Sequence, residues 1–237
     1  MRLPITFAFL VCFLFQSQAQ IDHWESVVLA ENQWSYLLPS EELPTDWNQV
    51  GFDDSAWLVG AGGMGHGDND DGTVIANTNA VFLRHTFNIE DLSAIEASIF
   101  HMDYDDAFVA YLNGVEIARS NIGTPGDSPS YNQFSDGLHE AQMYQGGNPD
   151  EFVLSNLESL FLEGENVLSI QAHNANSGSS DLSSNGFLHV GLYTTETLYQ
   201  TIPSWFNPPS ECLGFDLTIF TAAWGGEVFW SIVNEND

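Results

Sequence analysis

The feature that most constrains the fold of this chain is a succession of short apolar runs separated by turn-forming residues. Valine, isoleucine, phenylalanine and tyrosine recur in the runs, and glycine, asparagine, aspartate or serine bounds each of them, which is typical of β-strands. The sequence has neither long helical periods nor a regular alternation of strands with helices. The pattern therefore predicts an all-β protein built as an antiparallel β-sandwich. The main predicted strands are residues 80–87, 97–102, 108–112, 166–173 and 187–193.

Local signals place some of the connections between these strands. Asn113-Gly114 lies between two strand-like runs and predicts a tight hairpin, because a type I′ turn needs positive φ at both central residues. Residues 151–162 are expected to form a strand and a short helical turn. Two long polar segments, 60–79 and 120–150, predict loops that are functional or locally disordered.

The N-terminus carries the features of a secretory signal peptide, residues 1–19. Arg2 precedes the apolar run 5–15, and Ser17 and Ala19 provide small residues before a cleavage site at Gln20. The run is shorter than the roughly 20 residues that a membrane span needs. We therefore expect a secreted or cell-surface protein, with no membrane insertion after cleavage. Removal of the signal leaves Cys212 as the one cysteine, so no internal disulfide is expected and its partner could lie outside this sequence.

The C-terminal part predicts a change of domain. Residues 20–200 form the predicted sandwich. Residues 201–214 contain three prolines and are expected to be a linker. Residues 215–237 hold two strand-like runs around Gly225-Gly226, and a lone hairpin is marginal in water. We expect this segment to be the start of a truncated second β module, with further domains of the same polypeptide beyond it.

The charge balance excludes several classes of partner. Aspartate and glutamate number 33 against 3 basic residues, all arginines, for a formal net charge of −30. Nucleic-acid binding is excluded, since it needs clustered lysine and arginine. A polybasic attachment to anionic lipid is excluded on the same ground. Hydrophobic residues make up 43% of the chain, which is enough for a folded core.

Several strings of residues resemble a jelly-roll, galactose-binding-like module found in secreted bacterial multidomain proteins. That module often stands beside spore-coat-kinase-like, lamin-tail or phosphoesterase domains, and the later strings are also similar to the sugar-binding domain of family 2 glycosidases. The resemblance covers about residues 27–195 and implies the sandwich fold. One departure is Ala107, where the family commonly has glycine. The strings are 34–36, 51–57, 63–68, 82–87, 105–121, 164–168 and 179–182.

Two groups of aspartates are candidates for calcium binding. Asp68, Asp70 and Asp71 lie in a glycine-rich loop, and carboxylate and backbone oxygens are the ligands that Ca²⁺ prefers. The spacing does not match an EF-hand, and a solvated turn is the alternative. Asp103 belongs to the second group, which precedes a predicted strand. Calcium is the one cofactor that the sequence suggests, with Asp68, Asp70, Asp71 and Asp103 as candidate ligands.

Candidate ligand-binding residues are Trp47, Asp105 and Asp106. Aromatic rings stack on sugars, and paired carboxylates can bind a sugar hydroxyl, although buried tryptophan is the commoner case and we expect Trp34 and Trp57 in the core. The resemblance implies that the aspartates hold the loop before the strand. No catalytic residue is assigned, because no Gly-x-Ser-x-Gly elbow, His-Glu-x-x-His or phosphate-binding loop occurs.

These observations favour a non-catalytic accessory or binding module of an exported bacterial protein, with carbohydrate as its expected ligand and calcium as a candidate structural ion. The first alternative is the N-terminal segment of a secreted glycosidase or phosphoesterase whose catalytic domain lies beyond Asp237. The second is an architectural or adhesion spacer without a ligand.

Overall fold

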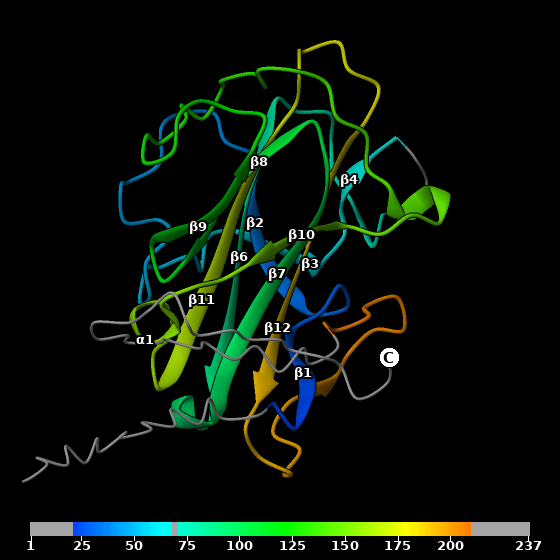
Figure 1. The fold of residues 1–237 in the computed structure, drawn as a ribbon. Coiled ribbons are helices and arrows are strands. Elements are labelled where there is room, and N and C mark those ends of the chain that lie inside the picture. The colour runs from blue at the N-terminus through cyan, green and yellow to red at the C-terminus, as the bar shows by residue number, and fades with distance from the viewer. Residues whose placement is uncertain (1–20, 68–70, 210–237) are drawn as a thin grey trace, which may run out of the picture. The chain divides into compact units, whose positions relative to one another are not determined.

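The structure, a computed structural model, describes residues 21–67 and 71–209 (Figure 1). It contains two β-sheets packed face to face, so the predicted all-β, antiparallel sandwich is confirmed. The signal peptide, Cys212, Asp68, Asp70 and the expected second module 215–237 lie outside the described residues.

One sheet has seven strands. Its central path runs in the order β10-β7-β12-β1-β13, and β4 pairs with β12 and with β5. All pairs are antiparallel except β4 with β5. The strands are β1 (His23–Val28), β4 (Met64–His66), β5 (Thr73–Val74), β7 (Ile95–Asp105), β10 (Asp150–Val153), β12 (Leu182–Leu192) and β13 (Gln200–Thr201).

The other sheet has six strands in the order β3-β2-β6-β11-β8-β9, and all of its pairs are antiparallel. The strands are β2 (Gln33–Leu37), β3 (Leu58–Ala61), β6 (Ala80–Ile89), β8 (Ala107–Leu112), β9 (Val115–Ser120) and β11 (Gly164–His173). Short helices connect some of the strands: η1 (Leu92–Ala94), η2 (Met143–Gln145) and α1 (Leu157–Leu160). No helix in the described part of the chain is long and apolar enough to cross a membrane.

The connections follow from local sequence. Asn113 and Gly114 have φ values of 53° and 84°, and they join β8 to β9 in the expected hairpin. Residues 151–162 form most of β10 and then α1, as predicted. Described residues of the two long polar segments form short elements, β4 and β5 in the first segment and η2 in the second.

The main core lies between the sheets. Alternating residues of β7, β11 and β12 point into it, including Phe100, Leu168 and Leu188, which have no exposed surface. Trp34 is also buried there, as expected. A second cluster forms on the outer face of the six-stranded sheet, where segments of residues 38–57 and 121–136 cover β6, β8 and β11. This second layer positions the candidate site.

The described fold continues beyond β13. The chain divides into two compact units, Met1–Asn207 and Pro208–Asp237, and the boundary falls inside the expected linker 201–214.

Candidate functional site

Trp47 is the centre of the second hydrophobic cluster. It is 7% exposed, and its ring packs edge-on against Phe82 of β6 and Tyr111 of β8 at centroid distances of 4.8 and 5.8 Å. Trp57 stacks beside it at 6.3 Å. Trp47 thus joins the covering segment to the sheet, and more exposed rings pack around it.

Three of these rings define the aromatic face: Phe52, Trp57 and Tyr131. All are half-buried and pack against the Trp47 cluster, and Phe52 meets Trp57 edge-on at 6.1 Å. We expected Trp57 in the core. Its intermediate exposure leaves part of the indole available to a ligand.

Arg84 anchors the segment that carries two of these rings. Its guanidinium, almost fully buried on β6, donates to the Asp54 carboxylate at 2.9 Å and to the backbone carbonyls of Trp47 and Gln49. It also lies over the Phe52 ring at 5.2 Å. Because a guanidinium offers several donors in a fixed plane, one side chain holds three points of this segment.

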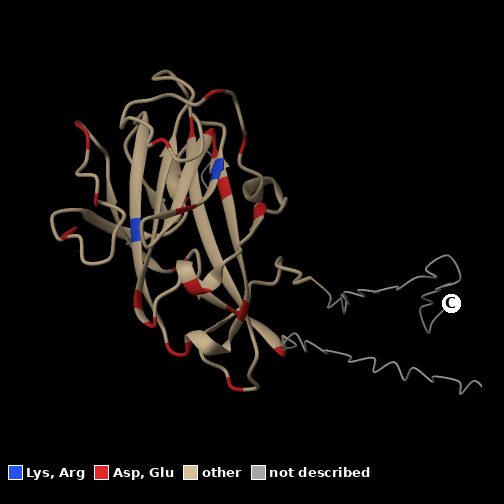
Figure 2. Cartoon of the chain, turned by 60° about the vertical axis from the view of Figure 1, so that its left-hand side comes forward, with Lys and Arg blue, Asp and Glu red and all other residues tan. Residues whose placement is uncertain are grey.

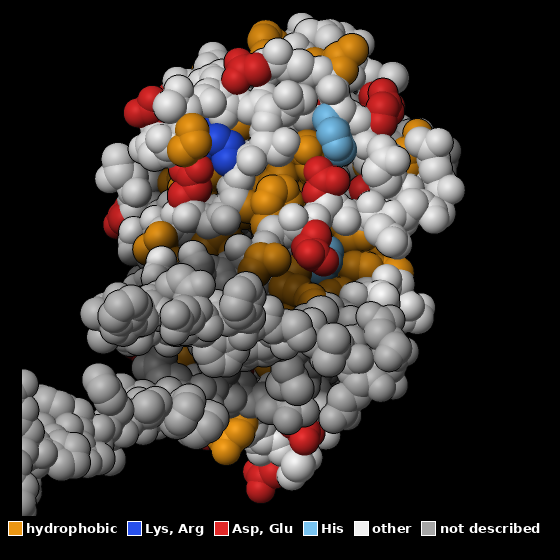
Figure 3. Space-filling view, viewed as in Figure 1, with side chains coloured by type: hydrophobic (Ala, Val, Ile, Leu, Met, Phe, Trp, Pro, Cys, Tyr) orange, Lys and Arg blue, Asp and Glu red, His pale blue; other side chains and the backbone are white. Residues whose placement is uncertain are grey.

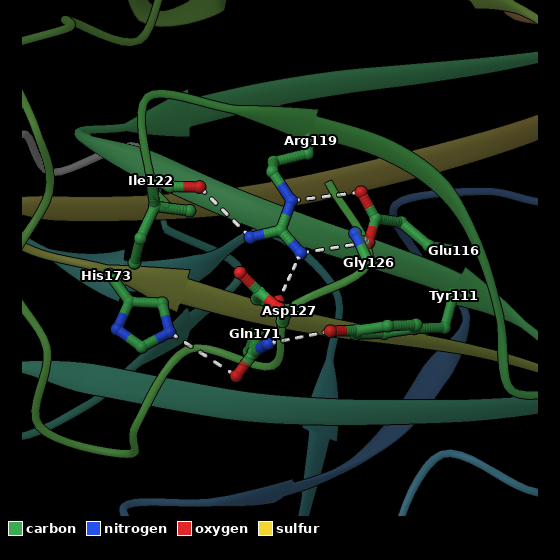
Figure 4. A network of polar contacts seen from close by, with 8 residues as sticks. All are labelled: Tyr111, Glu116, Arg119, Ile122, Gly126, Asp127, Gln171 and His173. Atoms are coloured by element: carbon green, nitrogen blue, oxygen red, sulfur yellow. Dashed lines mark hydrogen bonds and ion pairs between the residues drawn. The ribbon is translucent and has the colours of Figure 1, made fainter. Parts of the chain in front are cut away.

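Arg119 of β9 does the same for the second covering segment (Figure 4). It forms a bidentate pair with Glu116 at 2.9 Å for both contacts, and it donates to the carbonyls of Ile122 and Asp127. The pair raises the pKa of Arg119 and lowers the pKa of Glu116. Both arginines in the described part of the chain are therefore committed to holding loops on this face.

Polar side chains of β11 lie beneath these segments. Gln171 donates to the Tyr111 hydroxyl at 2.9 Å, and a ring nitrogen of His173 lies 2.9 Å from the Gln133 carbonyl. Burial lowers the pKa of His173 to about 4, so the imidazole is neutral near pH 7. The layer is a set of buried hydrogen bonds that fixes the aromatic face in place.

A second candidate feature lies on the outer side of β7. Carboxylate oxygens of Asp105, Glu140 and Asp181 all lie within 4.8 Å of one another. Asp105 is 2% exposed, Asp181 is half-buried and Glu140 is exposed. Burial, with Asp106, Asp181 and Glu140 nearby, raises the pKa of the Asp105 carboxyl to about 8. Such an arrangement needs either a proton or a cation to balance it.

The neighbouring aspartates are engaged with backbone. Asp106 accepts from the amides of His139 and Ala175 at 3.0 and 2.7 Å, and Asp103 accepts from the amides of Gln142 and Met143. These bonds hold the second long loop and the turn after β11 on the sheet. The loop-holding role that the resemblance implies is thus visible in the contacts of Asp106.

The structure separates the residues that the sequence singled out. Trp47 lies on the six-stranded sheet, whereas Asp103 and Asp105 lie on the outer face of β7 in the other sheet. Asp71 packs against Gly65 of β4 and is not a member of the three-carboxylate group found among the described residues. Sequence reasoning did not select Glu140 and Asp181. They are 35 and 76 positions from Asp105, and only the fold brings them together.

Comparisons with known proteins give the following. No protein-family model matches the sequence, and no curated protein matches it. Solved structures similar to it include a β-glucuronidase from glycoside hydrolase family 2, at 14% identity and a TM-score of 0.44, with 75% of this chain and 18% of that chain covered. The β-glucuronidase of Bacteroides uniformis gives the same identity and TM-score over 71% of this chain and 18% of its own. A β-glucuronidase from an uncultured Clostridium sp. has 14% identity and a TM-score of 0.44, with 76% of this chain and 30% of that chain covered. The chain thus spans less than a third of the length of each of these glycosidases.

Proposed function

We propose that this chain is a non-catalytic accessory module of an exported protein and that it binds carbohydrate on the aromatic face. The observation that carries the proposal is the partial exposure of Phe52, Trp57 and Tyr131, which pack on the buried Trp47 cluster. Aromatic rings with one exposed side stack against the apolar faces of sugars, and rings that are already held in place lose little conformational entropy on binding.

The charges favour a neutral glycan over an acidic one. The chain carries a formal charge of −30, and Arg84 and Arg119 already pair with Asp54 and Glu116. Uronate and sulfate groups are anions and would need a cationic side chain to bind. Among the described residues, both arginines are already paired with carboxylates, so neither is available for such a group. Sugar hydroxyls need no such partner.

The buried state of the acidic pair supports a role without catalysis. Glycoside hydrolysis needs two carboxyl groups placed across a bound sugar. Asp105 and Asp106 are 2% and 3% exposed, and Asp106 is occupied by two backbone amides. A substrate would not reach between them without displacing the loops that they hold.

The test is binding of the full chain to an array of neutral and acidic glycans, followed by titration calorimetry on the best ligand. We expect Trp57→Ala to weaken binding by about two- to tenfold, since a stacking ring contributes on the order of 0.5–1.5 kcal/mol. Tyr193→Ala is the matched control, because Tyr193 is 59% exposed and does not belong to the aromatic face. If no glycan binds, the carbohydrate proposal fails and the spacer hypothesis is favoured.

We also propose that calcium stabilises the module through Asp105, Glu140 and Asp181. Two observations support this. The three carboxylates converge, and the side-chain groups that act on the nearly buried Asp105 among the described residues are the carboxyl groups of Asp106, Asp181 and Glu140. Hard divalent cations prefer such oxygen ligands, and binding would relieve the repulsion within the group.

Thermal unfolding of the full chain in calcium and in a chelator tests this second proposal. We expect calcium to raise the midpoint in the wild type and not in Asp181→Asn. Glu158→Gln, which removes an exposed carboxylate on α1, should respond like the wild type. An unchanged midpoint in chelator would refute the calcium proposal and leave the glycan proposal intact.

A further inference from the structure

Strand β10 forms one margin of the seven-stranded sheet. It pairs with β7 and with no other strand in the described part of the chain (Figure 1). A strand at a sheet margin has one row of backbone N–H and C=O groups that can pair with another extended chain. The free side of β10 is therefore a candidate interaction surface.

The backbone groups of Glu151 and Val153 point to this free side. Leu154 donates its amide to the Ser98 carbonyl of β7 at 3.0 Å, and the register from there along β10 has no irregularity. Because successive residues of an antiparallel pair face the partner strand in alternation, Phe152 faces β7 and its two neighbours face away. Among the described residues, neither Glu151 nor Val153 makes a backbone hydrogen bond on that side. The margin thus presents the N–H and C=O groups of both residues, with the spacing that a further strand needs.

The other margins of the two sheets are shorter, capped or irregular. β5 and β13 have two residues each, and the Thr73 hydroxyl donates to the Ala61 carbonyl of β3 at 2.8 Å. The pairing of β9 with β8 shifts register between Ala110 and Tyr111. Short strands, bulges and prolines are the usual protection of a sheet margin. β10 has four residues in regular register and neither proline nor lysine, so it is the margin most open to pairing among those described.

Two exposed carboxylates make this margin acidic. The side chains of Asp150 and Glu151 are 46% and 47% exposed. His139 Nε2 lies 3.8 Å from the Asp150 carboxylate and His101 Nε2 lies 3.4 Å from that of Glu151, and neither described arginine pairs with these acids. Acidic side chains also surround a hydrophobic area on the face that Figure 3 shows. A second copy of this chain, at a formal charge of −30, would bring like charges together, whereas a basic chain would be attracted.

The side chains of β10 alternate between two environments. Phe152 points between the sheets, where it is half-buried and packs near Phe100 and Phe108 at ring-centroid distances of 6.1 and 5.6 Å. Glu151 and Val153 lie on the outer face, and Val153 is 73% exposed. An added strand would have the same alternation. Its inward side chains would extend the core beside Phe152, and its outward side chains would lie beside Glu151.

We propose that β10 is a docking edge for an extended segment of a partner protein in which lysine or arginine alternates with apolar residues. Hydrogen bonds to the backbone of Glu151 and Val153 provide a main-chain ladder, and apolar side chains beside Phe152 shield it from water. The basic side chains pair with Glu151, and the nearby Asp150 adds to the attraction. This edge belongs to the seven-stranded sheet and the aromatic face to the six-stranded one, so docking does not depend on glycan binding.

Titration calorimetry of the full chain with short synthetic peptides tests the proposal. We expect a peptide that alternates lysine with valine to bind, and one that alternates glutamate with valine not to bind. A lysine–valine peptide with methylated backbone nitrogens at its lysines has the same charge but cannot donate the ladder hydrogen bonds, so it should bind at least about tenfold more weakly. In hydrogen–deuterium exchange, the bound peptide should slow exchange of the Glu151 and Val153 amides, because both amides face the open edge.

Val153→Pro tests the ladder in the protein. The Val153 amide faces away from β7, so proline removes an outward donor without removing a hydrogen bond of the sheet. We expect binding of the lysine–valine peptide to weaken about tenfold or more. Val59→Pro, at an exposed position of the margin strand β3, is the matched control and should bind like the wild type. Glu151→Lys leaves the backbone intact and should weaken binding several-fold through like charge, which keeps the test decisive if proline perturbs the fold.

Three results would overturn the proposal: no binding of the lysine–valine peptide, equal binding of its methylated form, or equal binding to Val153→Pro. The last two would show attraction by charge alone, without a ladder at β10. Sedimentation of the chain without peptide provides a further check. A dimer that Val153→Pro abolishes would mean that a second copy, and not a basic partner, occupies the edge.

Discussion

Single buried amide side chains hold much of the loop structure in this domain. Asn166 at the start of β11 has no exposed surface, and its side chain makes four hydrogen bonds. It accepts from the Leu162 amide and from Asn113, and it donates to the carbonyls of Leu162 and Gly164. The turn after α1 and the β8–β9 hairpin are therefore joined through one residue.

Replacing Asn166 should cost more stability than an average substitution. In Asn166→Ala, backbone groups of Leu162 and Gly164 in part-buried hydrogen bonds lose their partner, so we expect a loss of about 2–4 kcal/mol in the free energy of unfolding. Urea denaturation would measure it. Asn132→Ala, at an exposed position, should change stability by less than about 0.5 kcal/mol. A similar small effect of both substitutions would contradict the assigned role.

Asp105 predicts an unusual pH dependence. An unfolded aspartate has a pKa near 4, whereas burial and the neighbouring carboxylates raise the pKa of Asp105 in the folded protein to about 8. Between these values the folded state binds the extra proton, so in chelator the carboxyl destabilises the fold progressively as pH rises from about 4 to 8. Asp105→Asn should flatten this slope and raise the thermal midpoint at pH 8. Glu158→Gln should keep the wild-type dependence of stability on pH. If the stability of Asp105→Asn fell with rising pH as steeply as that of the wild type, Asp105 would not be the group responsible.

Strands and hairpins of this molecule could be predicted because their signals are local. The apolar runs bounded by turn residues and the Asn113-Gly114 pair are visible without knowledge of the fold, and both are confirmed as strands and a hairpin. The positions of the segments that cover the six-stranded sheet could not be predicted in the same way. Those positions depend on contacts between residues far apart in the sequence, such as Arg84 with Asp54, 30 positions away. The same holds for the cluster of Asp105 with Glu140 and Asp181. Proline content marks residues 201–214 as a linker, but it gives no sign that Trp205 and Phe206 pack on a sheet.

The segment after β9 offers a prediction about one such element. Arg119, 6% exposed, joins Glu116 to the carbonyls of Ile122 and Asp127. Arg119→Ala should lower the free energy of unfolding by about 3 kcal/mol, because it leaves the carbonyls of Ile122 and Asp127 without this donor and the partly buried Glu116 carboxylate without its cation. It should also speed chymotrypsin cleavage at Tyr131 or Phe134. Arg119→Lys keeps the positive charge but lacks the planar guanidinium, so its stability and cleavage rate should lie between those of the wild type and of Arg119→Ala. Wild-type cleavage and stability in the alanine variant would show that other contacts hold the segment.

At the scale of the whole molecule, negative charge is distributed and not concentrated in one tail. Figure 2 shows acidic residues at many loops and strand ends, with the two described arginines apart from one another. Like charges spread over a surface repel one another, and this repulsion weakens the folded state more than the expanded unfolded chain. A net charge of −30 should therefore make stability dependent on ionic strength.

The expected result is a thermal midpoint that rises with sodium chloride. Screening shortens the range of the repulsion from about 30 Å at 0.01 M salt to about 3 Å at 1 M. The few ion pairs that salt also weakens, such as Arg84 with Asp54, are largely buried and less affected. If screening contributes about 2 kcal/mol, the midpoint should rise by about 4–8 °C for a domain of this size. Salt should act in chelator as well as in calcium, which separates general screening from binding at Asp105. A flat or falling midpoint in chelator would mean that the surface charges lie too far apart to interact, and the absence of lysine would then have no bearing on the stability of the fold.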